Sequence, residues 1–490
     1  MQAVNAFSTA HEMLTALDKR ELSAVELLDL HLRRIERYDS QLNAIVVRCF
    51  EQARQEAQRA DAARTRGDRA ALLGLPITLK ESMNVQGLPT TCGMPMWAES
   101  RVEYDAATRQ RTQAAGAVLL GKTNVPPMLA DWQSNNAVFG RTNNPWDLTR
   151  TPGGSTGGGA AALAAGLTPF EVGSDIGGSI RVPAAFCGVY GHRPSETALP
   201  RSGQFPFRPV PNPLTLMGVQ GPLARSAEDL ELALEVLAGP EGGEEVAWRL
   251  DIPPARHTRL AEYRVAVLPP VAWVPVDADI LAAQEELVRG LERAGVRVQV
   301  TQPAYFGDFK AHHMLYRSLL AAITGARNPE AERHRLAALH EALDDEFSEA
   351  HRRGLLATLG EYYTWYAQRE AYREAYRALF TDWDILLAPI TLIPAFPHVD
   401  MPWPRDAQAL AQTIEVNGHT VPYDLQLFHP ALATLSGQPA TAFPVGLTRA
   451  GLPIGLQAIG PYLEDRTPIR FAALVGQAFG GFQPPPGYAD

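Results

Sequence analysis

Cysteine is scarce in this sequence, and its scarcity excludes a fold held together by disulfides. Only Cys49, Cys92 and Cys187 occur among 490 residues. An odd and sparse set of cysteines fits a reducing compartment better than a disulfide framework. We therefore expect a cytoplasmic protein. Neither Cys92 nor Cys187 has a base nearby in the sequence, so we expect both to be small buried hydrophobic residues.

Long hydrophobic runs are also missing. The longest run of small apolar residues, 157–167, consists mostly of Ala and Gly and is soon followed by Pro169. It is too short for the roughly 20 apolar residues of a membrane-spanning helix. Residues 1–17 lack the basic stretch and the Leu-rich core of a signal peptide. We therefore expect no membrane as a partner.

The chain has no excess of positive charge. It carries 44 Lys and Arg against 54 Asp and Glu, for a formal net charge of -10. Nucleic acid as a main partner would require clustered Lys and Arg, which this sequence does not concentrate. With 46% hydrophobic and 20% charged residues, the chain can instead bury a large core, as a globular protein does.

A metal-binding pattern is lacking as well. His312, His313 and His398 are the histidines that would suggest one. Adjacent residues of a helix point to different faces, and no third ligand stands at a spacing typical of zinc sites. We therefore predict neither a metal nor any other cofactor.

What the sequence does contain is an alternation of helical and strand patterns. The capping-box patterns Thr9-x-x-Glu12 and Ser23-x-x-Glu26 predict two helices at the start. Apolar and β-branched runs predict buried strands, and amphipathic runs predict helices. The expected strands are 45–47, 73–79, 265–268, 296–300, 385–388 and two within 441–460; the expected helices are 51–69, 108–119, 280–294, 469–479 and most of 306–380. This alternation predicts an α/β fold.

The most informative segment is rich in glycine and alanine. Residues 151–159 read Thr-Pro-Gly-Gly-Ser-Thr-Gly-Gly-Gly and lead into an alanine-rich helix. Such a loop permits close backbone approach, and a helix N-terminus above it suits anions. A Walker phosphate loop, however, ends in Gly-Lys-Ser/Thr, and no lysine occurs between Thr151 and Thr168. A nucleotide-binding loop is therefore disfavoured.

A second glycine motif presents a candidate nucleophile. Residues 173–183 contain a Gly-Gly turn directly before Ser179, and the free backbone N–H groups of such a turn could hold an oxyanion. A serine hydroxyl needs a base. His192 lies 13 positions further on, which leaves a Ser-His-Asp triad open, but no Gly-x-Ser-x-Gly elbow supports it. Lys80 ends the apolar run 75–79, where desolvation favours the neutral amine that can act as a base.

Taken together, the motifs resemble those of the amidase signature family. The segments that carry the resemblance, in order and spacing, are Gly74-Leu-Pro-Ile-Thr-Leu-Lys80, Gly121-Lys-Thr-Asn-Val-Pro126, Gly153-Gly-Ser-Thr-Gly-Gly158 and Gly173-Ser-Asp-Ile-Gly-Gly-Ser-Ile-Arg-Val-Pro-Ala184. The separation of 24 positions between Ser155 and Ser179 matches that of the family's two catalytic serines. Segments 143–147, 187–191, 221–225 and 451–457 are also similar, so the resemblance spans nearly the whole chain.

The resemblance implies a role for each catalytic group. Ser179 would attack the amide carbonyl, Ser155, preceded by a cis peptide bond, would relay a proton, and Lys80 would act first as base and then as acid. The groups expected to hold the oxyanion are the backbone N–H groups of Ile176, Gly177, Gly178 and Ser179. Water would then hydrolyse the acyl-enzyme. Asp175 and Arg181 would brace the turn as a buried or half-buried ion pair.

The sequence departs from the family pattern at three places. Thr156 stands where many relatives have a second serine, Gly159 replaces a common serine, and residues 192–195 read His-Arg-Pro-Ser in place of Leu-Lys-Pro-Thr. None of these departures removes a catalytic group.

The resemblance also implies the architecture. We expect a single amidase domain over 1–490, with a twisted mixed sheet between helical layers and a signature core at about 65–230. The helical segment at about 306–380 is the expected cap over the substrate entrance. Its aromatic residues Tyr362, Trp365, Tyr366, Tyr372 and Tyr376 follow helical spacing, which favours packing on the core over a pocket wall. By family analogy, the residues expected to line the site are Leu129, Ala130 and Asp131.

Three functions are consistent with these patterns. The first is a free-standing amidase that hydrolyses a small or aryl carboxamide to a carboxylate and an amine or ammonia. Its expected partner is the small-molecule substrate, with a homodimer left open. The second is the amidase (glutaminase) subunit of a tRNA-dependent amidotransferase, disfavoured because residues 213–220 read Pro-Leu-Thr-Leu-Met-Gly-Val-Gln where that branch has a Phe-Ala-Ser-Ser-Leu-Asp-Gln-like segment. The third is a catalytically silent scaffold, disfavoured because Lys80, Ser155 and Ser179 are all present.

Overall fold

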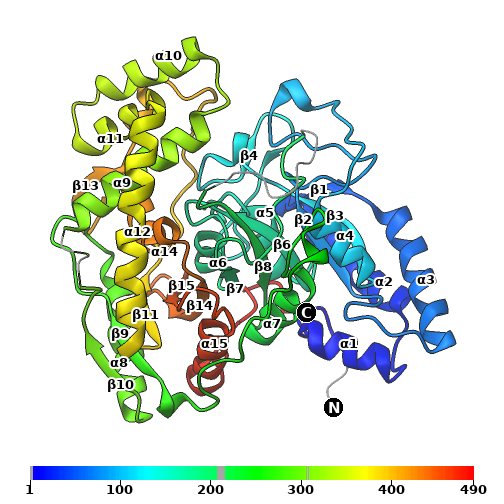
Figure 1. The fold of residues 1–490 in the computed structure, drawn as a ribbon. Helices are drawn as coiled ribbons and strands as arrows, with labels where there is room; N and C mark the ends of the chain where they lie inside the picture. Colours follow the sequence, from blue (N-terminus) through cyan, green and yellow to red (C-terminus); the bar gives the residue numbers. More distant parts are fainter. Residues whose placement is uncertain (1–3, 207–215, 305, 307, 490) are drawn as a thin grey trace.

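A computed structural model describes residues 4–206, 216–304, 306 and 308–489. Its main sheet is formed by the strands β1 (Ile45–Arg48), β2 (Pro76–Lys80), β3 (Val118–Thr123), β6 (Phe170–Asp175), β7 (Tyr190–Arg193), β8 (Val219–Ala224), β9 (Arg264–Val267), β10 (Arg297–Val300), β11 (Ile385–Pro389), β14 (Ala440–Leu447) and β15 (Pro453–Ile459). They run in the order β1-β3-β2-β6-β8-β7-β14-β15-β11-β9-β10 and mix parallel with antiparallel pairs (Figure 1). The predicted α/β fold with a mixed sheet is confirmed.

The first helices form because their N-termini are capped. Both predicted capping boxes are present, at Thr9 and at Ser23. The helices that follow along the N-terminal half are α1 (Ala10–Asp18), α2 (Ala24–Leu42), α3 (Phe50–Arg66), α4 (Ala107–Ala114), α5 (Gly157–Ala164), α6 (Arg181–Cys187) and α7 (Ala227–Leu237). A small hairpin, β4 (Asn135–Asn136) with β5 (Gly140–Arg141), lies between β3 and α5.

Glycine shortens two elements relative to the sequence pattern, one at its end and one at its start. The helix expected over 108–119 stops at Ala114 because Gly116 adopts φ +85°, after which β3 begins. The strand expected over 73–79 begins only at Pro76, since Gly74 adopts φ +80°. Positive φ interrupts both helix and strand geometry, and glycine is the residue that accepts it most readily.

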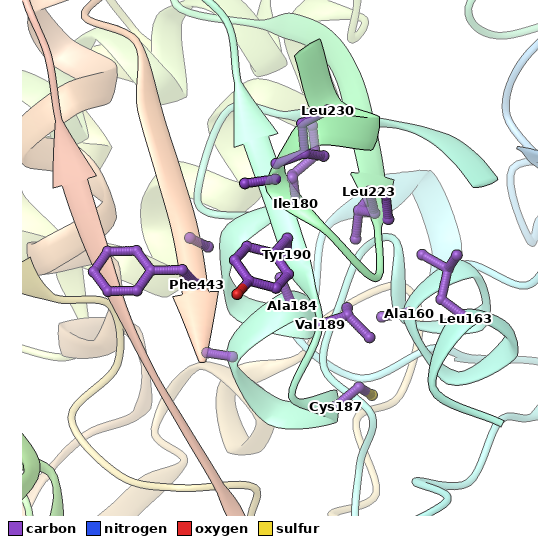
Figure 2. Packing of buried hydrophobic residues seen from close by; sticks show 14 of the residues in the cluster. Ala160, Leu163, Ile180, Ala184, Cys187, Val189, Tyr190, Leu223, Leu230 and Phe443 are labelled. Carbon is purple, nitrogen blue, oxygen red and sulfur yellow. The ribbon is translucent and has the colours of Figure 1, made fainter. Parts of the chain in front are cut away.

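Two layers of helices enclose the centre of the sheet. Along β7, Tyr190 lies against Gly476 of α15 (Arg466–Phe479), while the next residue, Gly191, lies against Ala184 of α6. Since successive residues of a strand point to opposite faces, α6 and α15 cover opposite sides of the sheet. Figure 2 shows this core, in which Cys187 is fully buried, as expected of a small hydrophobic residue.

The register of the central strands places polar side chains under α5. Thr78 pairs with Glu171, and Lys80 pairs with Thr123. Residues two apart along a strand share a face, so Thr78 and Lys80 point to the same side. The side chain of Glu171 lies against Gly159 of α5, so the face that bears Thr78, Lys80 and Glu171 is the one covered by α5.

The C-terminal half adds a helical layer to the outer strands. Its helices are α8 (Ala278–Arg293), α9 (Phe309–Gly325), α10 (Glu330–Glu341), α11 (Glu346–Leu355), α12 (Leu359–Asp382), α13 (Ala407–Leu410) and α14 (Phe428–Ser436), and its small hairpin is β12 (Thr413–Val416) with β13 (His419–Pro422). Helices α9 to α12 occupy the segment predicted to be helical and form the upper left of Figure 1. On α12, Trp365 and Tyr376 are buried, whereas Tyr366 is 39% exposed. Among the described helices, none is both long and apolar enough to cross a membrane.

Candidate active site

Lys80 ends the buried strand β2 and meets two serine hydroxyls. Its side chain is fully buried, and Nζ donates to Ser155 Oγ at 2.7 Å and to Ser174 Oγ at 3.0 Å. Burial lowers the pKa of Lys80 from 10.5 to about 7, although Asp175 and Glu171 act in the opposite direction. A substantial fraction of the amine is therefore neutral near pH 7 and can accept a proton.

Ser155 lies in a loop whose backbone is closely packed. The Gly154–Ser155 peptide bond is cis, as the family resemblance implies. A Cβ atom at Gly154 would lie 2.5 Å from the carbonyl oxygen of Asp131, so only glycine fits there. The loop thus holds Ser155 between Lys80 and the segment that follows β3.

Ser179 lies on the turn between β6 and α6 and is 6% exposed. Its carbonyl accepts a hydrogen bond of 3.1 Å from the backbone N–H of Thr156, which ties the two serine motifs together. Within the described residues, the Ser179 side chain makes no hydrogen bond, neither to Ser155 nor to another group.

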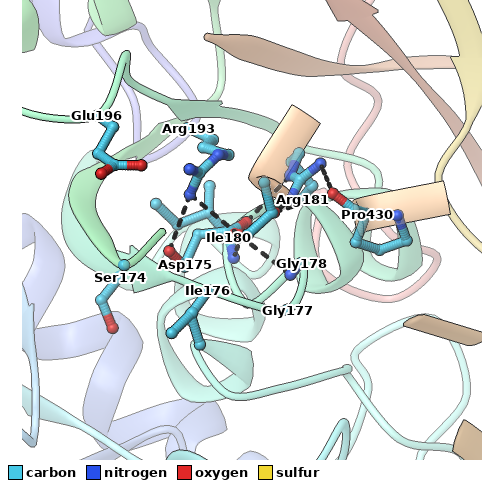
Figure 3. A network of polar contacts seen from close by, with 12 residues as sticks. Ser174, Asp175, Ile176, Gly177, Gly178, Ile180, Arg181, Arg193, Glu196 and Pro430 are labelled. Carbon is cyan, nitrogen blue, oxygen red and sulfur yellow. Dashed lines mark hydrogen bonds and ion pairs between the residues drawn. The ribbon is translucent and has the colours of Figure 1, made fainter. Parts of the chain in front are cut away.

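A buried ion pair braces this turn (Figure 3). The carboxylate of Asp175 accepts from Arg181 at 2.9 and 3.1 Å, from the Gly178 N–H at 3.0 Å and from the Ile180 N–H at 3.2 Å. Arg193 donates to the Asp175 carbonyl at 3.0 Å. Burial alone would raise the pKa of Asp175, but the charges of Arg181 and Arg193 lower it well below its usual value. The predicted pairing of Asp175 with Arg181 is present and fully buried.

Several N–H groups of the turn have no acceptor among the described residues. Of the four expected oxyanion donors, Gly178 already donates to Asp175. The N–H groups of Ile176, Gly177 and Ser179 form no hydrogen bond within the part of the chain that the structure describes. They are the donors that a developing negative charge at Ser179 would meet first.

Two aromatic side chains fix the peptide planes of the turn. The Tyr316 hydroxyl of α9 donates to the Ile176 carbonyl at 3.1 Å, and Trp132 Nε1 donates to the Gly177 carbonyl at 2.9 Å. In a planar trans peptide, C=O and the following N–H point in opposite directions. Anchoring the Ile176 carbonyl therefore also orients the Gly177 N–H. Sequence reasoning missed Tyr316, Trp132 and Ser174, and only Ser174 stands inside a recognised motif.

His192 has other partners. Its Nε2 lies 3.1 Å from Asp465 Oδ1, and its Nδ1 lies 2.9 Å from Thr441 Oγ1. Ser195 donates to the same carboxylate at 2.6 Å. Both ring nitrogens are thus engaged in a buried structural cluster, and this favours Lys80 over His192 as the base for Ser179.

The segment after β3 lies beside the Ser155 loop. Leu129 has a positive φ of 62°, a conformation unusual for a residue with a side chain. Ala130 and Asp131 line a small cavity together with Arg405. The Asp131 carboxylate accepts from the Tyr423 hydroxyl at 2.9 Å, and burial raises its pKa. The packing of the Asp131 carbonyl against Gly154 places the segment next to the Ser155 loop, and contact with substrate stays a prediction.

The wall facing the turn from the helical layer is apolar. A Cβ atom at Gly177 would lie 3.0 Å from Leu427 and 3.3 Å from the Tyr316 hydroxyl. Around Tyr316 lies a buried cluster from α9, α12, α14 and the segment before β8, against which Ile176 packs. Its buried members are Met217, Leu315, Tyr316, Leu319, Trp365, Ala431 and Leu435.

Two buried arginines of this layer already have acidic partners. Arg369 pairs with Glu196, and Arg317 pairs with Asp424 at 3.1 Å. Among the described residues, no group of three or more His, Cys, Asp or Glu side chains could hold a metal ion. His312 and His313 are buried among aromatic rings.

Comparison with known proteins finds relatives that match most of the chain. The sequence model of the amidase family matches residues 26–468. One of the subunits of glutamyl-tRNA(Gln) amidotransferase from Roseiflexus sp. (strain RS-1) is 33% identical over 96% of this chain and 95% of its own. Among solved structures, 6-aminohexanoate cyclic dimer hydrolase complexed with substrate has a TM-score of 0.78 and 26% identity, covering 99% of this chain and 100% of its own. A bacterial aryl acylamidase of the amidase signature family has a similar fold, with a TM-score of 0.79 at 24% identity over 97% of this chain and 96% of its own.

Proposed function

The chain belongs to the amidase signature family and is an amide-hydrolysing enzyme, and from this premise we propose that it cleaves the C–N bond of a small or aryl carboxamide through an acyl-enzyme on Ser179. The observation that carries the proposal is the buried hydrogen bond from Lys80 to Ser155 beneath the turn that bears Ser179. A lysine whose pKa is lowered to about 7 has a substantial neutral fraction near pH 7 and supplies the base that a serine nucleophile requires.

The proposed reaction proceeds in two stages. Neutral Lys80 takes the proton of Ser155, Ser155 takes that of Ser179, and Ser179 Oγ attacks the carbonyl carbon. The tetrahedral intermediate collapses, the C–N bond breaks, and the leaving nitrogen receives the proton back from Lys80 through Ser155. Water then attacks the ester: it gives one proton through Ser155 to Lys80, and that proton returns to Ser179 Oγ as the ester bond breaks. The acid that leaves loses its remaining proton to the solvent or to the released amine, and each stage leaves Lys80 neutral again.

The oxyanion is held by the turn itself. The unused N–H groups of Ile176, Gly177 and Ser179 supply the donors, whereas Gly178 has to share its N–H with Asp175. Preorganised backbone donors of this kind commonly contribute the largest catalytic effect, about 10²- to 10³-fold in rate for each donor.

The substrate class follows from the apolar wall. Leu427 and Tyr316 face the turn at Gly177, and the surrounding cluster is hydrophobic. Such a wall favours an uncharged apolar or aromatic acyl or amine group. We propose that helices α9 to α12, which make up the expected helical segment at about 306–380, form the cap that selects this group. The cap belongs to a single amidase domain spanning 1–490. Leu129, Ala130 and Asp131 line the opposite side of the site.

The second candidate is the glutaminase role within a tRNA-dependent amidotransferase. The 33% identity to one of the subunits of such an enzyme, over nearly its whole length, favours it. Glutamine, however, carries an α-ammonium and an α-carboxylate that need charged partners, and Arg369 and Arg317 already pair with acidic residues. The segment 213–220 differs in sequence from the glutaminase branch of the family, and its residues 213–215 lie outside the described residues.

A substrate panel with matched variants tests the proposal. The purified chain should hydrolyse simple aliphatic and aryl amides faster than glutamine, and Ser179→Ala should abolish turnover. Ser195→Ala is the control, because Ser195 is a buried serine that binds Asp465 away from the turn. Turnover that survives Ser179→Ala contradicts the mechanism, and preferential glutamine hydrolysis would instead support the amidotransferase role.

A further inference from the structure

A buried glutamate on β6 has no role in the mechanism above. The side chain of Glu171 is fully buried, and its Oε1 accepts a hydrogen bond of 2.7 Å from Thr123 Oγ1. Its Oε2 has no hydrogen-bond partner in the described part of the chain. Burying a carboxyl group without satisfying both oxygens costs free energy. A group retained at such a cost at the edge of an active site is a candidate for function.

Strand register brings Glu171 to the face of the sheet that bears Lys80. Glu171 pairs with Thr78, and Thr123, whose hydroxyl donates to Glu171, pairs with Lys80. Thr78 and Lys80 share a face because they are two residues apart. In this dry interior the charges of Glu171 and Lys80 act on each other.

The helix above the strand is shaped to admit this side chain. A Cβ atom at Gly159, in the first turn of α5, would lie 2.5 Å from Cγ and 2.6 Å from Oε1 of Glu171. This is the position where the sequence departs from the family by having glycine in place of a common serine. The departure is therefore explained, since glycine at 159 makes room for the glutamate at 171.

Few charged or titratable groups act on Lys80 besides Glu171. Asp175 on the same strand is committed to a buried ion pair with Arg181. Cys92, from the loop before α4, stays neutral because burial raises the pKa of its thiol well above the usual value. Of the three groups that influence Lys80, Glu171 is the one whose charge has no cationic partner of its own.

We propose that Glu171 is a positioning residue of the proton relay: its carboxyl sets the proton affinity of Lys80 and stabilises the ammonium that forms when Lys80 receives the proton from Ser155. An ionised carboxylate attracts a positive charge on Nζ, whereas a protonated carboxyl does not. Burial raises the pKa of Glu171 to about 7, so that the two groups titrate over the same range and their protonation is coupled. This inference rests on the proposed role of Lys80 as base.

The test is the pH profile of kcat/KM in a variant that keeps the shape of the side chain. Glu171→Gln removes the carboxylate, so the Lys80 ammonium loses stabilisation, its pKa falls, and the acid limb moves to lower pH by about 0.5 to 1 pH unit. Glu56→Gln is the matched control, because Glu56 is also a buried glutamate but pairs with Arg109 on the far side of β3 from the serines. The acid limb of Glu56→Gln should stay where it is in the parent.

A second variant keeps the test decisive if Glu171→Gln folds poorly. Gly159→Ser should lower Tm in the parent, because its side chain collides with Glu171, and Glu171→Ala should relieve that loss in the double variant. The double variant Gly159→Ser/Glu171→Ala should show the same shift of the acid limb. An acid limb that coincides with the parent's in the folded variants overturns the proposal.

The outcome also separates this inference from the proposed function. If Lys80→Met keeps its turnover, the role of Lys80 as base is wrong and both proposals fail. If Lys80→Met is inactive while the Glu171 variants show an unmoved acid limb, only the inference about Glu171 fails.

Discussion

The proposed mechanism depends on the protonation of one residue, Lys80. Its pKa is lowered to about 7 by burial, which outweighs the carboxylates of Asp175 and Glu171. Between about pH 7 and 10.5 the unfolded chain binds a proton at this lysine that the folded chain does not. Its contribution to stability therefore rises with pH across that window.

This environment predicts the pH dependence of the rate. Acylation requires the neutral amine, so kcat/KM should fall about tenfold per pH unit below about pH 7 and level off above it. Lys80→Met should lose about 10²- to 10⁴-fold in kcat, the usual contribution of a general base. The measurement is steady-state hydrolysis of an aryl amide from pH 5 to 9.

Lys122→Met provides the comparison. Lys122 is a second fully buried lysine, but it donates to Pro89 and to Thr90 rather than to the serines. Its loss should lower Tm while the acid limb stays in place. An unchanged kcat in Lys80→Met would return the search for the base to a histidine.

At the level of residues, the groups that were predicted stand inside recognised motifs. Lys80 and Ser155, 75 positions apart, meet as expected, and Asp175 pairs with Arg181 within one turn. Glu171 and Tyr316 were not predicted, because their meaning depends on partners that are distant in the chain. Tyr316 contacts a carbonyl 140 positions away, and no local pattern encodes such a contact.

The turn between β6 and α6 is held in place by a contact from helix α9. Helix α9 reaches it through the Tyr316 hydroxyl, which fixes the peptide plane between Ile176 and Gly177. The helical layer is thereby coupled to the N–H groups that we propose as oxyanion donors. A change in α9 would alter their orientation without touching the serines.

Tyr316→Phe tests this coupling because it removes one hydroxyl group. We expect kcat to fall about tenfold or more with little change in KM, since misaligned donors weaken the transition state more than the bound substrate. Tyr376→Phe is the matched control: Tyr376 is also fully buried and donates to a backbone carbonyl, that of Leu432, at 3.0 Å. Both variants should lose about 1 kcal/mol of stability. Equal kcat values in the two would show that the Tyr316 bond is merely structural.

Helices and strands were predicted well where hydrophobic periodicity or a helix cap defines them locally. The capped helices α1 and α2 and the strands β9 to β11 lie where the patterns indicate. The ends were less predictable, because Gly74 and Gly116 adopt positive φ only in the context of their neighbours. A pattern of apolar residues does not reveal which glycine will turn the chain.

Across the whole molecule, one sheet carries parts that are remote in sequence. Strand β7 pairs with β14, and β15 pairs with β11, so the N-terminal and C-terminal halves share a continuous sheet. The alternation of elements predicted an α/β fold but not this strand order. Neighbours within a sheet are chosen by long-range packing, and the sequence pattern of a strand does not name its partner.

The complete enzyme should work without a metal ion. The proposed relay uses Lys80 and two serines, and it assigns no step to a cation. Prolonged dialysis against EDTA should therefore leave kcat and KM unchanged. A loss of activity that Zn²⁺ or another divalent cation restores would contradict this prediction.

The ion pair beneath the nucleophile turn has a wider electrostatic consequence. Three buried guanidinium groups, those of Arg181, Arg193 and Arg369, stand beside two carboxylates, those of Asp175 and Glu196. Nε and Nη2 of Arg193 have no hydrogen-bond partner among the described residues. The cluster therefore retains one surplus positive charge in a medium that screens it poorly. On the proposed mechanism, this charge would favour the anion formed at Ser179 even before a substrate arrives.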